Sequence, residues 1–403
     1  MEEVQTLLDP RVADVRLEFG IARAEVAHAA IARAQAEQMS AIVATLREAR
    51  EFPELYVGPT QLGPSAVEFA ERAAIADLAV RLNLAESTVR AQAFEADTLR
   101  TLTPTLWNSF RDGQVSAANA STVASLCIGL TDAACQSFEA ELLYPAATLA
   151  PARFRSMARA LRERLVAEPP TERHERAAEG RRVILEPDLD GMAWVHAYLP
   201  ADAAQRAMLN VTRMAQKLAK AGDETRTIAQ LRADVAADLL AGVLGAEGSV
   251  GVTVGVTVPV LTLLGGDEPG ILEGHGPIDA TTARRLAAHA PSFIRILTHP
   301  VTGTVRDIDR TRYRPPADLK RMVGLRDVVC TFPGCGRRAR DCDLDHTVAW
   351  DDEGKTAEPN LASLCRHHHR LKHETNWSVD RSDGVSTWTS PSGAIRTSDP
   401  PPF

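Results

Sequence analysis

The sequence predicts an α+β protein in which a mainly helical N-terminal region with a small β-sheet precedes a distinct C-terminal module. Two observations support this fold class. Apolar residues recur at steps of three and four through most of the first 180 residues, the period of core-facing helices. Four of the six cysteines and five of the eleven histidines crowd into residues 330–373, which favours a metal-binding module.

Length and composition limit the class of protein. A chain of 403 residues is long enough for two or three domains, and 45% hydrophobic with 24% charged residues is ordinary for a globular protein. The start, MEEVQTLLDP, carries acids where an export signal needs basic residues, and no run approaches the roughly 20 apolar residues of a membrane span. We therefore expect a cytoplasmic protein without a membrane partner.

The helical elements follow in order along the chain. Residues 12–50 predict one long helix, which the three prolines and two glycines of 52–64 end. Residues 74–99 have the rhythm of a helix-turn-helix with its turn near Asn83, typical either of a DNA-reading hairpin or of plain helical packing. Helices are also expected within 102–126 and 151–168.

Strand signals begin later. At 181–200 the apolar period changes to two around a turn at 188–191, which predicts a β-hairpin. Helices at 201–220 and 227–243 and a strand at 250–260 should follow, and then, within 293–327, a hairpin around Pro300–Gly303 and a short helix. These elements suggest four parts: a helical domain with a small sheet (1–300), a basic connector (301–325), the metal-rich module (326–380) and a C-terminal tail (381–403).

Charge is distributed unevenly. The whole chain has a net charge of −8, yet residues 306–340 hold ten basic against four acidic side chains. A basic segment beside a metal cluster indicates a polyanionic partner, although a solvated basic face would have the same composition.

The cysteines and histidines sort into two metal sites. On a helical wheel Cys365 and His368 lie towards one side, so they can complete a tetrahedral Cys₃His zinc site with Cys330 and Cys335. Cys342 is an alternative ligand in place of His368. His367 faces away from both sites, as expected for a contact with solvent or phosphate.

The second site is suited to catalysis. His369 and His373, four residues apart, can join Asp345 around a divalent ion such as Mg²⁺ or Mn²⁺. His346 should point to the opposite side of a strand from Asp345, which leaves it available as a general base on water. Asn360 can hydrogen-bond to that imidazole and fix its orientation.

These residues together carry a resemblance. The stretch DLDHTVAW followed by NLASLCRHHHRLKH is similar to the HNH endonuclease motif of the ββα-metal fold, in its zinc-stapled branch, over residues 326–378. The resemblance implies metal-dependent DNA cleavage with His346 as base, Asn360 as its orienter and Asp345, His369 and His373 around the metal. The usual second Cys-x-x-Cys pair is here Cys365-x-x-His368.

The longer region also resembles a known family. DGMAWVHAYLPADAAQ and DETRTIAQLRADVAADLLAG are similar to the helical domain of unknown function that precedes HNH nucleases in many actinobacterial proteins. Its most recognisable residues are expected to form a buried polar network: Arg226, Gln230, Arg232 and Asp234.

The sequence therefore predicts an HNH endonuclease that hydrolyses DNA phosphodiester bonds, with structural Zn²⁺ and one catalytic divalent cation. The competing class is a non-catalytic, zinc-stabilised DNA-binding regulator of a mobile element that uses the helix-turn-helix-like stretch. In either class a set of basic residues is expected to contact DNA: Arg337, Arg338, Arg340, Arg366, Arg370 and Lys372.

Overall fold

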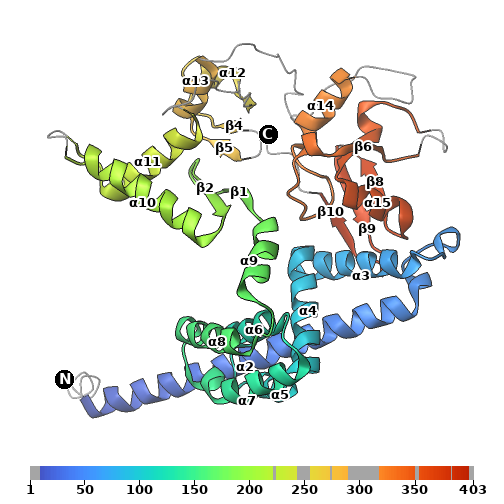
Figure 1. Cartoon of the computed structure of the whole chain (residues 1–403). Coiled ribbons are helices and arrows are strands. Elements are labelled where there is room, and N and C mark those ends of the chain that lie inside the picture. Colours follow the sequence, from blue (N-terminus) through green and yellow to red (C-terminus); the bar gives the residue numbers. More distant parts are fainter. Residues whose placement is uncertain are drawn as a thin grey trace, which may run out of the picture. The chain divides into compact units, whose positions relative to one another are not determined.

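The chain divides into two units. Unit 1 comprises Met1–Ala167 and Ile296–Phe403, and unit 2 comprises Glu168–Arg295. Figure 1 shows the computed structural model, which describes residues 10–220, 224–242, 255–272, 275–288, 317–349, 354–382 and 384–398. The expected hairpin around Pro300–Gly303, most of the connector and the basic residues Arg306, Arg310, Arg312 and Arg314 lie outside these ranges.

The N-terminal part of unit 1 is a helical bundle built on one long helix. The predicted helix at 12–50 is confirmed as α2 (Pro10–Glu51). Two short 3₁₀ turns follow where the prolines stand, η1 (Pro53–Leu55) and η2 (Pro59–Gln61). The remaining helices of the bundle are α3 (Ala66–Leu82), α4 (Glu86–Leu102), α5 (Pro104–Arg111), α6 (Ala117–Cys127), α7 (Asp132–Thr148) and α8 (Pro151–Leu165).

The helices of the bundle pack around one apolar core. Fully buried side chains from successive helices meet in one apolar cluster, among them Leu99, Phe110, Phe138 and Phe154. Gly113 lets the turn between α5 and α6 approach α2, because a Cβ there would lie 2.6 Å from the carbonyl oxygen of Ala29. Its φ of +79° is also one that glycine adopts without strain.

The predicted helical hairpin at 74–99 is confirmed as α3 and α4. Asn83 ends α3 in the left-handed conformation, with φ of +53°, and the amide of Leu84 then bonds to the carbonyl of Ala79 at 2.9 Å. Asn tolerates this conformation better than most residues, so it makes a tight turn here.

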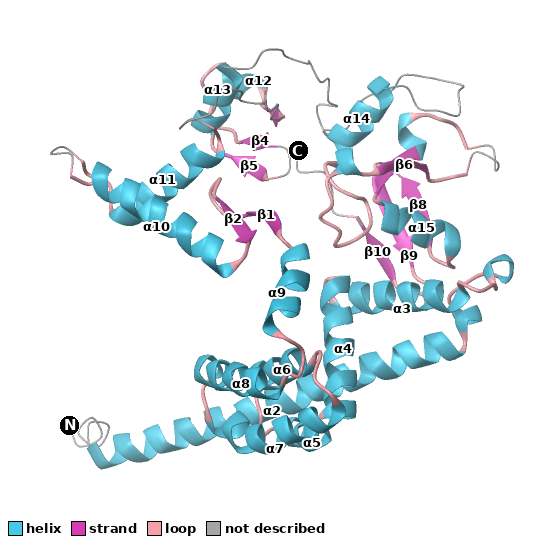
Figure 2. Ribbon diagram, viewed as in Figure 1, coloured by secondary structure: helices cyan, strands magenta, loops and turns pink. Residues whose placement is uncertain are grey.

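The C-terminal module of unit 1 has a ββα core. Strand β6 (Asp343–His346) pairs antiparallel with β7 (Leu361–Leu364), and α15 (Arg366–Glu374) contacts both strands. Before them come α14 (Ala317–Asp327) and η3 (Ala339–Asp341), and η5 (Glu358–Asn360) leads into β7. Figure 2 shows that the strands described in unit 1 gather in this module. Together with the helical bundle, this arrangement confirms the predicted α+β class.

Most of the segment expected as a C-terminal tail contributes to this module. A three-stranded antiparallel sheet is formed by β8 (Ser378–Ser382), β9 (Val385–Thr389) and β10 (Ile395–Thr397), with β9 in the centre. Its fully buried Trp388 packs edge-on against Phe332 and Trp377, with ring centroids 5.1 and 6.3 Å away. This apolar contact attaches the sheet to the turn at residues 330–335, which carries two of the predicted zinc ligands and is called the zinc knuckle.

The module also packs on the helical bundle within unit 1. Ala73, Ala76 and Val80 of α3 share one apolar cluster with Phe332 and Trp377 of the module. Trp377 Nε1 donates to the carbonyl of Ala73 at 3.3 Å. Figure 1 shows α3 running along this side of the module, next to α15, and the two helices are in contact. The bundle and the module thus have a common core.

Further polar bonds hold the same contact. The amide of Asn376 donates to the carbonyl of Tyr56 at 2.7 Å. Arg81, at the end of α3, donates to the carbonyl of Ser392 at 2.9 Å, and the hydroxyl of that serine bonds to the buried carboxylate of Asp77.

Unit 2 contains the predicted hairpin. It is formed by β1 (Arg182–Pro187) and β2 (Ala193–Tyr198), and His275 bonds to the carbonyl of Met192 in the turn region. Of the strand expected at 250–260, residues 255–260 are described, and only Val256–Thr257 of these form a strand, β3, while Val260 already begins a helix. The other elements of unit 2 are α9 (Pro170–Glu179), α10 (Ala201–Leu218), α11 (Ile228–Leu240), α12 (Val260–Leu263), β4 (Gly270–Leu272), β5 (Gly276–Ile278) and α13 (Ala280–Ala288). Strand β3 pairs with β4 in a three-stranded sheet separate from the hairpin, so the prediction of one shared sheet is wrong.

The expected polar network of unit 2 forms in part, but the prediction that it is buried is wrong. Arg226 pairs with Asp234 at 2.8 Å and with Glu224 at 2.7 Å, while the side chains of Arg226 and Asp234 are each 49% exposed. Arg232 bonds instead to Thr212 of α10, and Gln230 caps α11 with Thr227. These residues therefore fix a loop and a helix start.

None of the helices in the described ranges is long and apolar enough to cross a membrane.

Candidate metal centre and active site

The four side chains predicted to bind zinc lie together. Cys330, Cys335, Cys365 and His368 place one ligand atom each within 4.8 Å of the others. Nδ1 of His368 lies 3.4 Å from Sγ of Cys330 and 3.3 Å from Sγ of Cys365. Zn–S bonds of ~2.3 Å and Zn–N bonds of ~2.0 Å in a tetrahedron separate S and N by about 3.5 Å. The donor set and its spacing therefore fit a structural zinc ion.

Local structure brings these donors together. Cys330 and Cys335 lie in the short turn before η3, where the Cys330 amide bonds to the Arg337 carbonyl at 2.7 Å. Cys365 is the N-cap of α15, so His368 follows one turn later on the same side of that helix. Hydrogen bonds from Cys330 and Cys335 lower the pKa of Cys365, whereas hydrogen bonds within the same cluster raise the pKa of Cys335.

Cys342, the alternative ligand, lies outside this group of four. Its side chain is buried in the apolar cluster that contains Phe332 and Trp377, and its Sγ lies 3.3 Å from the carbonyl oxygen of Arg338. The geometry therefore favours His368 as the fourth ligand.

The prediction that His367 faces solvent or phosphate is wrong. Its Nε2 lies 2.9 Å from Oε2 of Glu86, in the first turn of α4. The other oxygen of the same carboxylate, Oε1, lies 2.8 Å from Nε2 of His368. The helical bundle thus covers the face of α15 that the helical wheel leaves open.

Glu86 is held as a carboxylate in this position. Burial raises its pKa, but hydrogen bonds from His367 and His368 outweigh that effect, so the pKa lies well below the usual value of a glutamate. Arg90, one turn further along α4, also donates to Oε2 at 2.7 Å. No sequence signal identified this residue, because it lies about 280 positions from its partners.

The second predicted set of ligands is also assembled. Oδ1 of Asp345, whose side chain is 3% exposed, lies 2.8 Å from Nε2 of His373 and 3.4 Å from Nε2 of His369. Two donors at right angles around an ion with bonds of ~2.1 Å stand about 3.0 Å apart. The two imidazoles and one carboxylate therefore fit a divalent cation with open coordination positions.

Lys372, expected on the DNA-facing surface, lies in this site. Its side chain is only 10% exposed, and Nζ lies 2.5 Å from Oδ2 of Asp345 and also bonds to the carbonyl of His346. The ammonium group thus bonds to one oxygen of the Asp345 carboxylate, and the other oxygen faces His369 and His373. Burial raises the pKa of Asp345, but bonds from His369 and His373 and the charge of Lys372 hold it well below its usual value.

His346 lies next to the ligand carboxylate on β6. Its Nε2 lies 2.9 Å from the hydroxyl of Thr356, a fully buried side chain that fixes the ring. Burial is the main cause that lowers the pKa of His346 below its ordinary value. The imidazole is therefore neutral near pH 7 and can accept a proton.

The amide of Asn360 braces the loop that leads from β6 to β7. Its Oδ1 accepts from the Val348 amide at 2.8 Å, and Nδ2 donates to the carbonyls of Val348 and Lys355 at 3.1 and 2.9 Å. These bonds hold the segment that carries Thr356, so Asn360 supports His346 through the loop. A direct bond from its amide to the imidazole stays a prediction.

The other predicted DNA contacts differ in exposure. Arg337 and Arg340 are exposed, and the Arg366 side chain is 81% exposed with Asp343 at 3.7 Å. Arg338 is half-buried. Arg370 lies over the ring of Phe69 of α3, 5.0 Å from its centroid, so part of its role is to contact the bundle.

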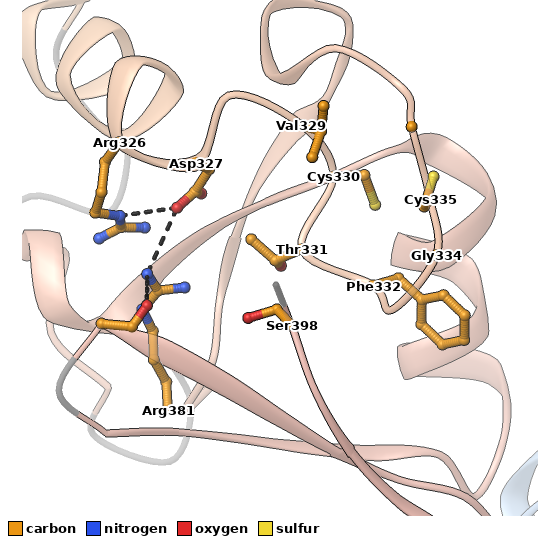
Figure 3. A pocket seen from close by; sticks show the side chains of 12 residues that line it. Arg326, Asp327, Val329, Cys330, Thr331, Phe332, Gly334, Cys335, Arg381 and Ser398 are labelled. Carbon is orange, nitrogen blue, oxygen red and sulfur yellow. Dashed lines mark hydrogen bonds and ion pairs between the residues drawn. The ribbon is translucent and has the colours of Figure 1, made fainter. Parts of the chain in front are cut away.

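A cavity of about 250 Å³ lies beside the zinc knuckle, away from Asp345. Figure 3 shows Arg326 and Arg381 turned towards Asp327 on one side of it, with Cys330 and Cys335 on the other. The two arginines reach Oδ1 of Asp327 at 2.8 and 3.5 Å, and all three side chains are at most 3% exposed. Arg326 also pairs with the carboxylate of Glu358, so two cations meet two carboxylates and the cavity wall is a structural ion-pair network.

The ββα core, the cluster of three cysteines and His368, and the buried carboxylate beside two histidines are the features expected of an HNH domain. The family model described as HNH endonuclease matches residues 329–375. The chain belongs to the family of the domain of unknown function DUF222, whose model matches residues 26–327. Both resemblances noted in the sequence are thereby confirmed.

Curated relatives come from Mycobacterium tuberculosis. The chain is similar to Uncharacterized protein Rv3776, with 37% identity over 132 residues, which is 32% of this chain and 24% of that protein. It is also similar to Uncharacterized protein Rv2100, with 36% identity over 140 residues, or 33% and 25% of the two chains. The matches thus span about a quarter of the length of these relatives. No solved structure matches the chain.

Proposed function

We propose that this protein is a metal-dependent endonuclease that hydrolyses DNA phosphodiester bonds at the Asp345 site. The single observation that carries the proposal is the buried carboxylate of Asp345, which lies within 3.4 Å of both His369 and His373 and adjoins His346 on β6. A zinc-stapled binding module needs Cys330, Cys335, Cys365 and His368, but it has no use for a second ligand set.

The residues divide the chemistry between them. A divalent cation held by Asp345, His369 and His373 would polarise the phosphodiester and neutralise the leaving oxygen. His346 accepts a proton from water as the water oxygen attacks phosphorus. The bond from phosphorus to the 3′ oxygen breaks, and the leaving oxygen takes a proton from solvent. Thr356 keeps the imidazole in place throughout.

Exposed arginines would supply affinity for the backbone. Arg337, Arg340 and Arg366 are exposed on the module and would contact phosphates without reading base sequence. We therefore expect binding that weakens steeply with salt.

The alternative, a regulator that reads DNA through the α3–α4 hairpin, has a geometric difficulty. In a helix-turn-helix the N-terminal residues of the second helix contact base edges. Here Glu86, in the first turn of α4, contacts His367 and His368 of the module. An acidic side chain at this position is also unfavourable next to phosphates.

Cleavage of supercoiled plasmid tests the proposal. Purified wild type with Mg²⁺ or Mn²⁺ should nick the plasmid, and EDTA should abolish the reaction. His346→Ala should lower the rate by 10²–10⁴-fold, the usual contribution of a general base. His174→Ala is the matched control, because His174 is an exposed histidine in unit 2.

If His346→Ala and His174→Ala cleave the plasmid at the same rate, His346 is not the base. If the folded wild type leaves plasmid and linear DNA intact with every divalent ion tried, the nuclease proposal fails and a DNA-binding role is favoured.

A further inference from the structure

We propose that Glu86 of the helical bundle is the outer-shell carboxylate of the zinc centre, which holds the fourth ligand and joins zinc binding to docking of the nuclease module. This inference rests on zinc at the Cys₃His site, but not on catalysis at Asp345. It assigns the DUF222 region a physical role in the nuclease module.

The two nitrogens of His368 have separate partners. Nδ1 faces the sulfur atoms of Cys330 and Cys365, whereas Nε2 lies 2.8 Å from Oε1 of Glu86. A zinc-binding imidazole typically donates its other N–H to a carboxylate, which fixes the tautomer and makes the ligand nitrogen a better donor to metal. The carboxylate, imidazole and thiolates are arranged for that bond.

The geometry around the ring leaves it little freedom. Phe332 stacks on His368 with ring centroids 3.9 Å apart and planes 10° apart, and the His368 side chain is 7% exposed. Glu86 itself is 15% exposed and is also bonded to His367 and Arg90. Both oxygens of the carboxylate are therefore used, and the side chain points at the ring in a fixed orientation.

A histidine at position 368, rather than a cysteine, makes the contact with Glu86 favourable. A cysteine thiolate at position 368 would be negatively charged and would have no N–H to offer a buried carboxylate. The departure from the usual Cys-x-x-Cys pair thus gives the zinc site an atom that reaches outside the module. The partner of that atom lies in α4, in the region matched by DUF222.

The contact between Glu86 and His368 joins the helical bundle to the C-terminal module. Ala73, Ala76 and Val80 of α3 pack in one cluster with Cys330, Cys365 and Phe332. A loosened zinc knuckle would disturb this shared core, and a displaced α4 would remove the carboxylate. Zinc binding and docking should therefore weaken together.

Zinc affinity of the full-length protein tests the inference. Glu86→Gln keeps the size of the side chain and removes its charge, and Glu86→Ala removes the acceptor altogether. Glu95→Gln is the control, because Glu95 is a half-buried glutamate of the same helix that bonds to Ser121. Zinc content is measured by mass spectrometry, and affinity by competition with a chromophoric chelator.

We expect both Glu86 variants to keep their zinc content but to bind zinc 10–100-fold more weakly, with Glu95→Gln like wild type. Hydrogen exchange should report docking. The Asn376 amide, which bonds to the Tyr56 carbonyl, should exchange faster in Glu86→Gln and also in wild type after chelation.

Three results would overturn the inference. Unchanged zinc affinity in both Glu86 variants would show that the carboxylate does not support the ligand. Loss of a whole zinc equivalent in Glu86→Gln would make Glu86 a ligand rather than an outer-shell group. Wild type without zinc would remove the premise, while plasmid cleavage would still judge the nuclease proposal separately.

Discussion

Replacement of Arg326 by Leu should loosen the strands that carry the active site. Arg326 lies in the last turn of α14, and its side chain is 3% exposed. It donates to Asp327 Oδ1 and to the Glu358 carbonyl, both at 2.8 Å, and to the Leu361 carbonyl at 2.5 Å. These bonds attach α14 to η5 and to the start of β7, which pairs with the strand of Asp345 and His346.

The expected loss of stability follows from the groups that Arg326→Leu leaves without a partner. The carboxylate of Glu358, 12% exposed, loses its partner in an ion pair, and two carbonyl groups lose their donor. Breaking a buried ion pair costs about 3–5 kcal/mol. Asp327 keeps Arg381 and the Ser363 amide at 2.7 Å, so the cost should not exceed that range.

Hydrogen exchange of the β6 and β7 amides measures this effect locally. A loss of about 3–5 kcal/mol lowers protection by roughly two to four powers of ten, since about 1.4 kcal/mol corresponds to tenfold. Arg337→Leu is the control, because Arg337 is exposed and should change protection little. A loss of protection below tenfold in Arg326→Leu would refute the reasoning.

Two further predictions concern charge. Hydrogen bonds from Arg50 lower the pKa of Glu71, so this pair stabilises the bundle above about pH 4.5 and its contribution disappears as pH falls through the lowered pKa. Glu71→Gln should cost ~0.5 kcal/mol at pH 7 in urea unfolding, because both side chains are partly exposed, and this cost should shrink as pH falls through the lowered pKa of Glu71. A cost that stays constant as the pH falls would contradict this. Arg337→Gln should reduce the slope of log affinity for DNA against log salt by about 1; an unchanged slope would exclude a phosphate contact.

The sequence predicted much of the candidate site because its ligands follow local geometry. Cys365 and His368 are one helical turn apart, as are His369 and His373, so each pair shares a face in any helix. Alternation along β6 likewise separates Asp345 from His346. These relations depend on backbone period alone, and the structure reproduces the two groups.

Predictions failed where a distant element supplied the contact. A helical wheel leaves His367 facing outward, yet α4 covers that face and brings Glu86 to it. Composition assigns Lys372 to a basic surface, but the fold of β6 against α15 turns its ammonium onto Asp345. The sequence assigns the segment from 381 onward to a tail, although Trp388 is buried in the central strand of a sheet.

The sequence by itself therefore determined the helical bundle, the ββα module, and which residues group into two candidate metal sites, because periodicity and ligand spacing act over a few residues. Only the tertiary structure decided which surface of α15 the bundle covers and which charges meet around Asp345 and His368. Those contacts join positions up to about 280 residues apart, and they form because burying the apolar faces of α3 and the zinc knuckle together brings their polar neighbours within hydrogen-bonding distance.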